Sequence, residues 1–396
     1  MKLQVSRSVR LPDPVKLARF RRTPELGPRV LFFSGGTALR PLSQALLDYT
    51  HNSIHLITPF DSGGSSAVLR NAFSMPAVGD LRNRLMALAD RTVRGNPAIF
   101  ELFAHRLPKD AGQADLREQL DALVRGKTKL VRDIPDPMRK IIRNHLRFFV
   151  ERMPDDFDLR GASVGNLILT GGYFNNGRHI DPVIYLFGKL VEVRGHVRPV
   201  VNEDLHLRAD LEDGTVVVGQ HLITGKETAP LVSPVRRLSL CKGPDDPEPV
   251  TPQVQSKIRE AIGSAELICY PMGSFYSSVL CNLLPGGVAG AVSDTDCPKV
   301  YVPNTGHDPE QTGMTLLSSV RVLLDTLQAG CPPDTPRDRL LNFVLLDSGR
   351  GGYPEPLELE RIRRMGVEIL DAPLVTDDSA PLLDETAVIE HLLSLA

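Results

Sequence analysis

Two glycine-rich turns near the start of the chain combine residue types that suit an anionic ligand. The first reads Ser34-Gly35-Gly36-Thr37-Ala38 and the second reads Asp61-Ser62-Gly63-Gly64-Ser65-Ser66. Because glycine has no Cβ, backbone N–H groups can approach a phosphate closely, and a helix that begins after the turn adds a favourable dipole of about 0.3–1 kcal/mol. The residues expected to bind phosphate are Gly35, Gly36, Thr37 and Ala38 in the first turn and Gly63, Gly64, Ser65 and Ser66 in the second.

Asp61 directly follows the apolar run Ser53–Phe60. A carboxylate at the tip of a strand, beside a phosphate turn, can accept a hydrogen bond from a sugar hydroxyl or bind a hard cation such as Mg²⁺. An Asx turn capped by glycines explains the same residues without a ligand, and this stretch alone leaves both interpretations open. Asp61 is the candidate metal-binding residue.

The first turn does not match the better-known glycine motifs. It lacks the G-x-G-x-x-G pattern of dinucleotide-binding folds and the Gly-Lys-Ser/Thr ending of a P-loop. The sequence Arg40-Pro41-Leu42 nearly matches the start of sugar nucleotidyltransferases, but the Pro-Lys pair that should follow in the next helix is missing. A tight connection between a strand and a helix would explain the turn equally well.

Further polar residues lie where other helices are expected to begin. In the stretch Pro76–Asp90, Arg82 can face a phosphate and Asp80 or Asn83 can orient an acceptor, although Asp80 also suits a helix N-cap. Asn166 lies in "GASVGNLILTGGYF", which resembles the G-x-S-x-G motif of serine hydrolases only superficially, because no strand precedes it. We exclude a serine hydrolase.

A third donor-rich loop, "PMGSFYSSV", follows a predicted strand in the second half of the chain. Another predicted strand, "KVYVPN", ends in an asparagine. The candidate nucleotide-binding residues in these two places are Gly273, Ser274, Tyr276, Ser277 and Asn304. Polar loops that all follow predicted strands are hard to explain as folding signals alone, so together they predict a nucleotide pocket.

The elements that must position these residues form a parallel sheet. Two apolar runs, Val30–Phe33 and Ser53–Phe60, flank a helical stretch and make a βαβ unit. Strand-like runs return in "ELICY", "KVYVPN" and "NFVLLD". Ligands of such sheets bind at the carboxyl ends of the strands. The predicted fold class is α/β, a Rossmann-like three-layer sandwich with a mostly parallel sheet, plus a helical insertion and a small β subdomain.

Hydrophobic periodicity divides the chain into regions. Apolar spacing of i, i+3 and i+4 predicts helices between residues 81 and 160, whereas short alternating runs with a hairpin turn at Asp213-Gly214 predict strands between 181 and 240. The predicted division is a basic arm at 1–28, a nucleotide-binding core at 29–80, 161–180 and 241–396, a helical insertion at 81–160 and a small β subdomain at 181–240.

The basic arm is either a docking segment for an acidic partner or a solvated extension. We prefer the extension, because terminal segments are commonly loosely held.

Composition excludes several classes of protein. A net charge of −2 gives no overall basic field, so we expect no nucleic-acid partner. No apolar run is long enough to span a bilayer and the N-terminus lacks the apolar core of a signal peptide, so we expect no membrane partner and a cytoplasmic protein. The 5 cysteines form no C-x-x-C pair, which argues for reduced thiols.

Taken in order, the motifs resemble those of one family. The string "GGT…DSGGSS…GDLRN-x-L-x-ALAD…G-x-S-x-GNL…PMGSFYSSV-x-x-NLL…KVYV-x-N" is similar to the family that contains 2-phospho-L-lactate transferase (CofD) and the bacterial gluconeogenesis factor (YvcK). The likeness is closest to the second branch. It runs from Val30 to Leu327 through several ordered motifs.

The resemblance implies a core that binds a nucleotide diphosphate or a nucleotide sugar. In the transferase branch, a phospholactyl group moves from guanosine-diphosphate-linked lactate to a deazaflavin precursor with Mg²⁺ as cofactor. Asp61, Asp80 and Asn83 are the catalytic residues on that hypothesis. The alternative is a non-catalytic regulator that binds UDP-N-acetylglucosamine, as the regulatory branch does. The resemblance also suggests a homodimer or a regulatory protein partner.

The sequence departs from the family pattern in both glycine turns. The family usually has Gly-Gly-Gly-Thr-Gly in the first turn, whereas this chain has Ser34 and Ala38 at its ends. We expect the Cβ of Ala38 to restrict positive φ and to crowd a close phosphate. The paired aspartates of the second turn become Asp61-Ser62, which weakens the case for Mg²⁺.

Overall fold

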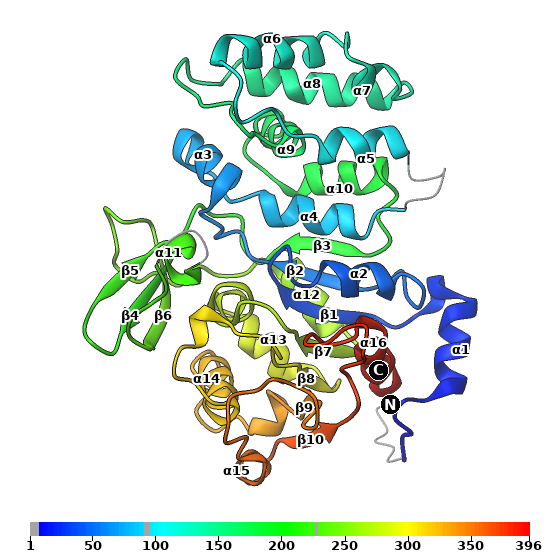
Figure 1. The fold of residues 1–396 in the computed structure, drawn as a ribbon, viewed down its shortest axis with the longest axis vertical. Helices are drawn as coiled ribbons and strands as arrows, with labels where there is room; N and C mark the ends of the chain where they lie inside the picture. Colours follow the sequence, from blue (N-terminus) through cyan, green and yellow to red (C-terminus); the bar gives the residue numbers. More distant parts are fainter. Residues whose placement is uncertain (1–7, 91–95, 226–228) are drawn as a thin grey trace.

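A parallel sheet of seven strands forms the centre of the computed structural model, which describes residues 8–90, 96–225 and 229–396 (Figure 1). The strand order is β10-β9-β8-β7-β1-β2-β3, and the paired strands are parallel. The strands are β1 (Val30–Ser34), β2 (Ile54–Ile57), β3 (His196–Pro199), β7 (Leu267–Tyr270), β8 (Lys299–Tyr301), β9 (Phe343–Leu346) and β10 (Glu368–Asp371). The predicted α/β fold with its parallel sheet is confirmed.

The central strand β1 is buried on both faces, as its unbroken apolar run predicts. Leu31 and Phe33 pack into the core on one face of the sheet. Val30 and Phe32 pack into a separate core on the other face. This alternation of side chains makes the sheet the middle layer of a three-layer sandwich.

Helices cover both faces of the sheet. One layer contributes to the core with Leu31 and includes α12 (Ser256–Gly263), α13 (Val288–Asp294), α14 (Leu316–Gln328) and α15 (Leu359–Arg363). The other contributes to the core with Phe32 and includes α1 (Pro14–Arg22), α2 (Arg40–Leu46) and α16 (Glu385–Leu395). Among the residues that the structure describes, no helix is both long and apolar enough to cross a membrane.

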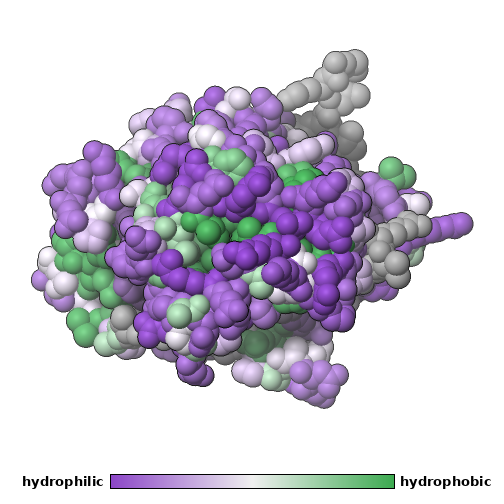
Figure 2. All heavy atoms as spheres, turned by 90° about the horizontal axis from the view of Figure 1, so that it is seen from above, coloured by the Kyte–Doolittle hydropathy of each residue, from purple (hydrophilic) through white to green (hydrophobic). Residues whose placement is uncertain are grey.

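A helical region extends the molecule beyond the β3 edge of the sheet and has a core of its own (Figure 1). Its helices are α3 (Gly64–Phe73), α4 (Gly79–Ala87), α5 (Pro97–Ala104), α6 (Gln113–Val124), α7 (Lys129–Arg132), α8 (Met138–Val150), α9 (Val164–Asn175) and α10 (Asp181–Leu190). Figure 2 looks onto its far end, where hydrophilic residues surround a narrow hydrophobic strip. Because α9 and α10 belong to this region, it continues past the predicted boundary at residue 160.

The strand prediction for residues 181–190 is wrong, because this segment is α10. Its buried residues, Val183, Ile184, Phe187 and Leu190, recur with helical spacing. The next strand, β3, belongs to the large sheet. The small antiparallel sheet is confined to β4 (His206–Leu211), β5 (Val216–Val218) and β6 (Val235–Cys241), in the order β5-β4-β6. The predicted hairpin turn is confirmed between β4 and β5, where Gly214 has a φ of +89°.

The basic arm is not a solvated extension where the structure describes it. Its residues 14–22 form α1, whose Leu17 is buried in the core shared with α16. The ammonium group of Lys16 donates to the carbonyl oxygen of Ser394 at 3.2 Å, and Arg21 pairs with Glu390 at 3.1 Å. The arm therefore docks onto the last helix of its own chain. Residues 1–7 of the predicted arm lie outside the described residues.

Gly171 of α9 packs against the backbone of His145 in α8, and this contact allows a test of the helix packing. A Cβ built on Gly171 would overlap the carbonyl oxygen of His145 and lie 2.7 Å from its carbonyl carbon. Because a rotamer change cannot relieve a clash with backbone, we expect Gly171→Ala to lower the free energy of unfolding by about 3 kcal/mol. Urea unfolding followed by circular dichroism measures this change.

Gly290→Ala in α13 is the matched control, because no atom lies within 4 Å of its added Cβ. Helix propensity should make this variant more stable by roughly 0.5–1 kcal/mol. Equal stability of the two variants would contradict the close packing of α8 on α9.

Candidate functional site

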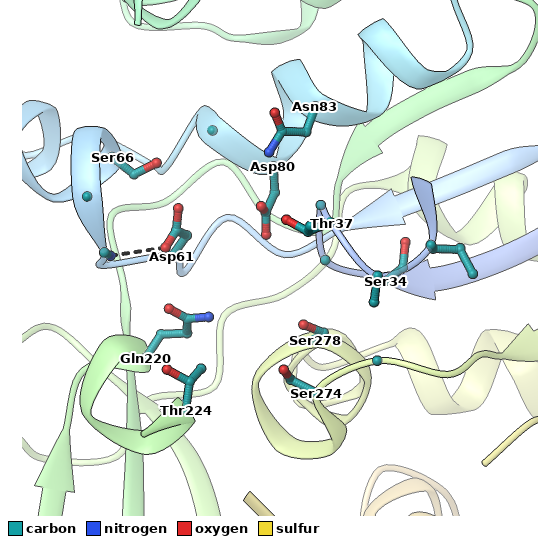
Figure 3. A pocket seen from close by; sticks show the side chains of 18 of the residues that line it. Ser34, Thr37, Asp61, Ser66, Asp80, Asn83, Gln220, Thr224, Ser274 and Ser278 are labelled. Atoms are coloured by element: carbon teal, nitrogen blue, oxygen red, sulfur yellow. Dashed lines mark hydrogen bonds between the residues drawn. The ribbon is translucent and has the colours of Figure 1, made fainter. Parts of the chain in front are cut away.

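A cavity of about 360 Å³ lies at the carboxyl ends of β1, β2 and β7, the edge at which parallel sheets bind ligands (Figure 3). Both glycine turns line it, together with the first turns of α3 and α4 and the loop after β7. The sequence-predicted residues that line it are Gly35, Gly36, Thr37, Ala38, Asp61, Gly63, Gly64, Ser65, Ser66, Asp80, Arg82, Asn83, Asn166, Gly273 and Ser274. The structure thus brings together segments that lie far apart in the sequence.

The glycines of the first turn are required by close packing and not by backbone torsion. Gly35 and Gly36 do not have positive φ angles. A Cβ on Gly36 would overlap the carboxylate of Asp80, and a Cβ on Gly35 would lie 2.6 Å from the hydroxyl of Ser278. The turn therefore has no room for side chains at these two positions, because other polar groups of the cavity wall occupy it.

Ala38, at the end of this turn, does not have the positive φ that we expected its Cβ to restrict. Its Cβ lies 3.5 Å from the position that a Cβ on Gly273 would take. Gly273 has a φ of +140° and belongs to the third loop. A Cβ at position 273 would therefore make only an ordinary van der Waals contact with Ala38, and it is the positive φ that favours glycine there.

A buried arginine supports the first turn from behind. Arg84 of α4 is fully buried and donates to the backbone carbonyl oxygens of Gly35 at 2.8 Å and Leu39 at 3.0 Å. Burial lowers the pKa of Arg84 to about 10, and the nearby charge of Asp80 opposes this shift. Because C=O and N–H of a trans peptide point in opposite directions, the N–H of Gly36 is directed away from the arginine.

A second buried arginine supports the second turn. Arg70 of α3 donates to the carbonyl oxygens of Phe60 at 3.1 Å and Asp61 at 3.2 Å. It also forms an ion pair with Asp204 at 2.7 Å and donates to the carbonyl oxygen of Leu205 at 2.7 Å. These contacts join the second turn to the segment that leads into the small sheet.

Asp61 forms the Asx turn that the sequence left open and also lines the cavity. Its Oδ1 accepts the N–H of Gly63 at 3.0 Å, which Figure 3 marks with a dashed line. Its Oδ2 lies 3.3 Å from the position of a Cβ on Gly79, the residue that precedes Asp80. Among the described residues, no group of three His, Cys, Asp or Glu side chains could hold a metal ion. A cation here would need ligands from the substrate or from water.

Three helices begin at the cavity wall, and their N-termini favour negative charge. Ser65, Asp80 and Asn166 lie in the first turns of α3, α4 and α9 and line the cavity. The N-cap of α4 is Val78, so Asp80 is not the cap that its sequence position suggested. The guanidinium of Arg82 adds a full positive charge to the same wall.

Ser163 joins several parts of this wall and is fully buried. Its hydroxyl accepts from Arg82 and from the N–H of Asn166, the latter at 3.4 Å, and its own N–H donates to the hydroxyl of Ser65 at 3.4 Å. An isolated β-bridge connects it to Arg106. Within the described part of the chain, Oδ1 of Asn166 is buried without a hydrogen-bond partner, so a donor on a ligand would satisfy it.

The predicted positions of Tyr276, Ser277 and Asn304 need correction, because they do not line the cavity. After Ser274 the chain forms a π-helical turn, Phe275–Val279, that directs its N–H groups inward. The N–H groups of Tyr276 and Ser277 donate to a carboxylate oxygen of Glu310 at 2.8 and 2.9 Å. Asn304 accepts from the N–H of Gly273 at 2.7 Å and donates to its carbonyl oxygen at 2.6 Å. The three residues therefore support the loop that reaches the cavity.

Sequence reasoning missed several lining residues, among them Arg106, Gln220, His221 and Thr224. Ser278, which also lines the cavity, lies in the third donor-rich loop that the sequence predicted. Gln220 and Thr224 come from α11 (Gln220–Thr224), next to the small sheet, and lie opposite Asp80 and Asn83 in Figure 3. Gln220 and Thr224 are four residues apart, so they lie on the same face of a helix. They directly follow Gly219, whose φ is +121°. This spacing after a glycine is a sequence signal for a polar helix face.

The carboxylate behind the third loop gives a pH-dependent prediction. Burial and the charge of Asp308 raise the pKa of Glu310 from an ordinary value near 4.5 to about 7, against the opposing effect of hydrogen bonds from Ser277 and Tyr276. Between these two values the folded protein binds more protons here than the unfolded chain, so the free energy of unfolding falls as the pH rises. We expect Glu310→Gln to remove this slope, which is up to about 1.4 kcal/mol per pH unit.

Urea unfolding of both proteins across this pH window measures the difference in slope. The same slope in wild type and variant would show that Glu310 does not titrate with the raised pKa.

Comparison with known proteins agrees with the fold and the order of the motifs. The family model described as 2-phospho-L-lactate transferase CofD matches residues 30–375. The gluconeogenesis factor of Bacillus subtilis is 28% identical over 381 residues, which cover 92% of this chain and 97% of that protein. That of Halalkalibacterium halodurans is 29% identical over 313 residues, 77% of this chain and 76% of that protein.

A solved structure has the same fold. It is that of a UPF0052 family protein from Bacillus halodurans, which superposes with a TM-score of 0.67 at 24% identity and covers 93% of this chain and 99% of its own. The family match extends over most of the chain and includes both glycine turns, Arg82 and the third loop. The chain therefore belongs to the CofD family.

Proposed function

We propose that the cavity binds a nucleoside diphosphate compound and that the protein transfers its phospho-linked group to an acceptor, as 2-phospho-L-lactate transferases do. The observation that carries this proposal is the convergence of two glycine turns and the buried guanidinium of Arg82 on one cavity. The match of this chain to the CofD family supports the same class of ligand.

The diphosphate fits the side of the cavity formed by the two turns. Arg84 and Arg70 bind the carbonyl groups of these turns from behind, so the turns are held in shape before a ligand arrives. Arg82 donates to Ser163 and to Asn83. Because both partners are uncharged, the positive charge of Arg82 can bind an anionic ligand. Guanidinium groups bind phosphate through paired hydrogen bonds.

The nucleoside fits the opposite side of the cavity. The third loop has its N–H groups at Gly273, Phe275, Tyr276 and Ser277 bonded to Asn304, Asp308 and Glu310, so they are not available to phosphate. What remains on this side are uncharged side chains, including Ser274, Ser278, Gln220 and Thr224. Hydroxyl and amide groups suit a ribose or a base better than a phosphate.

The reaction depends on alignment of the donor and the acceptor more than on covalent catalysis by the protein. Phospho-group transfer is accelerated by clamping the diphosphate, neutralising developing charge and orienting the acceptor hydroxyl. Arg82 would stabilise charge on the transferred group. Asp80 and Asn83, one turn apart on α4, would orient the acceptor at the same wall.

The two carboxylates of the cavity, Asp61 and Asp80, fit a Mg²⁺ ion only together with ligand oxygens. Mg²⁺ commonly binds one or two carboxylates along with substrate phosphates and water. Asp61 keeps Oδ2 on the side of Gly79 while Oδ1 accepts from Gly63. When bound, the ion would neutralise charge on the diphosphate. Arg82 and the helix N-termini would supply the protein's own share of that stabilisation.

A second candidate function is a regulator that binds a nucleotide sugar without turnover. Two points favour it: the similar proteins from two organisms are named gluconeogenesis factors, and Asp61 is followed by Ser62, where the family resemblance implies a second aspartate. On this hypothesis the same cavity binds the diphosphate of UDP-N-acetylglucosamine, and the occupied state is sensed by a partner protein.

A thermal-shift panel of GDP, GTP, UDP-N-acetylglucosamine and NAD tests the shared part of both hypotheses. A ligand at a hundredfold excess over its Kd stabilises the protein by about 2.7 kcal/mol. We expect stabilisation by at least one nucleoside diphosphate compound and an affinity about tenfold lower in Arg82→Gln, because the phosphate loses a charged donor. Arg117→Gln on α6, a residue that does not line the cavity, is the control and should bind as wild type does. Stabilisation by none of the four compounds would refute the proposal.

The role of Asp61 separates the two functions. We expect Asp61→Asn to remove the effect of Mg²⁺ on nucleotide affinity, because an amide is a weaker ligand for a hard cation than a carboxylate. Calorimetric titrations of wild type and variant, each with Mg²⁺ and with EDTA, measure this. Wild-type titrations that are the same with and without EDTA would count against the metal-assisted transferase and leave the regulator.

A further inference from the structure

Arg106 reaches the cavity from the helical region and not from the sheet. It follows α5, and its segment runs beside the start of α9, where Leu107 N–H donates to Ala162 at 2.9 Å and Val164 N–H donates to His105 at 3.0 Å. One nitrogen of its guanidinium donates to the carbonyl oxygen of Gly161 at 3.1 Å. Arg106 is thus held at its backbone and at one end of its side chain, beside the same wall as Arg82.

Positive charges converge on this wall. Burial together with the charges of Arg106 and Arg40 lowers the pKa of Arg82 to about 10, against the opposing effect of Asp80. Like charges at short range destabilise each other, and an anion between them would relieve this. Both Arg82 and Arg106 line the cavity, so a bound anion could contact both.

The two arginines differ in how deeply they lie. Arg82 is 8% exposed and donates to Ser163, whereas Arg106 is exposed to solvent. A phosphate near the first and second turns would contact Arg82 first. Arg106 is on the solvent side, where the outer group of an extended anion would lie.

We propose that Arg106 is a specificity residue that binds the outer phosphate of a diphosphate ligand and makes the protein select nucleoside diphosphates over monophosphates. This inference rests on the proposed nucleotide site. A monophosphate has one phosphoryl group and can satisfy Arg82 alone. A diphosphate has a second group and more negative charge, so it gains a further charge-assisted contact. The helical region would thereby contribute directly to ligand choice.

Lys109 offers a matched control for this idea. It is an exposed cation three residues after Arg106, and its side chain packs on the same residue, with Cγ 3.1 Å from the position of a Cβ on Gly161. It does not line the cavity. Loss of its charge changes the net charge of this surface by the same one unit as loss of the charge of Arg106.

The experiment compares dissociation constants for UDP and UMP, and for GDP and GMP, in the full-length protein by calorimetry. We expect Arg106→Ala to reduce the preference for diphosphate over monophosphate about tenfold, mainly by weakening the diphosphate. Lys109→Ala should leave this ratio unchanged. Arg106→Lys should restore part of it, because the charge remains but the paired hydrogen bonds do not. Melting temperatures check that each variant is folded.

The outcomes separate this inference from the proposed function. If wild type binds a diphosphate and Arg106→Ala keeps the wild-type ratio, the role of Arg106 is refuted while the nucleotide site stands. Equal weakening of diphosphate and monophosphate, or the same effect from Lys109→Ala, would also refute it, because a general field would then explain the data. If wild type binds neither these four nucleotides nor any compound of the thermal-shift panel, both proposals are wrong.

Discussion

The hydrogen bonds of Arg84 to the first glycine turn are the contact on which the cavity depends. Taking a guanidinium out of water costs several kcal/mol unless its donors are satisfied. In this protein the backbone carbonyl groups of Leu39 and Gly35 accept from its two terminal nitrogens, while Nε is buried without a partner among the described residues. The cost of burial therefore favours one conformation of the turn, and that conformation directs the N–H of Gly36 away from the protein interior. Arg70 has the same relation to Phe60 and the second turn.

The loops around the cavity are supported by opposite charges, and this gives the cavity two ends. Arginines lie behind the two glycine turns, whereas the side chains of Asp308 and Glu310 lie behind the third loop. The N–H groups of Phe275, Tyr276 and Ser277 in the third loop already donate hydrogen bonds to those carboxylates. An anion is consequently favoured at the arginine-supported end and disfavoured at the other. A ligand with one charged and one uncharged half would bind in a single orientation.

Most of the sheet and both glycine turns could be predicted from the sequence, because buried parallel strands leave unbroken apolar runs and turns leave glycines. The third loop could be located but not oriented, since the direction of Tyr276 depends on Glu310, a residue more than thirty positions away with no local signal. Gln220 was missed because the only signal for it, polar residues spaced by four after Gly219, is short and matches no known binding motif. The segment at Val183 was mistaken for a strand because several apolar residues in a row fit either period.

The strand order has a consequence for synthesis of the chain. The central strand β1 pairs with β2 soon after both are made, but its other neighbour, β7, begins only at Leu267. Until that point emerges from the ribosome, one edge of β1 has unpaired N–H and C=O groups, which are prone to pair with other chains. The first helix, α1, reaches its final position later still, because Lys16 and Leu17 pack on α16, which is made last. The residues of α1 are among the first to be made and among the last to reach their final place, so the nascent chain needs protection for most of its synthesis.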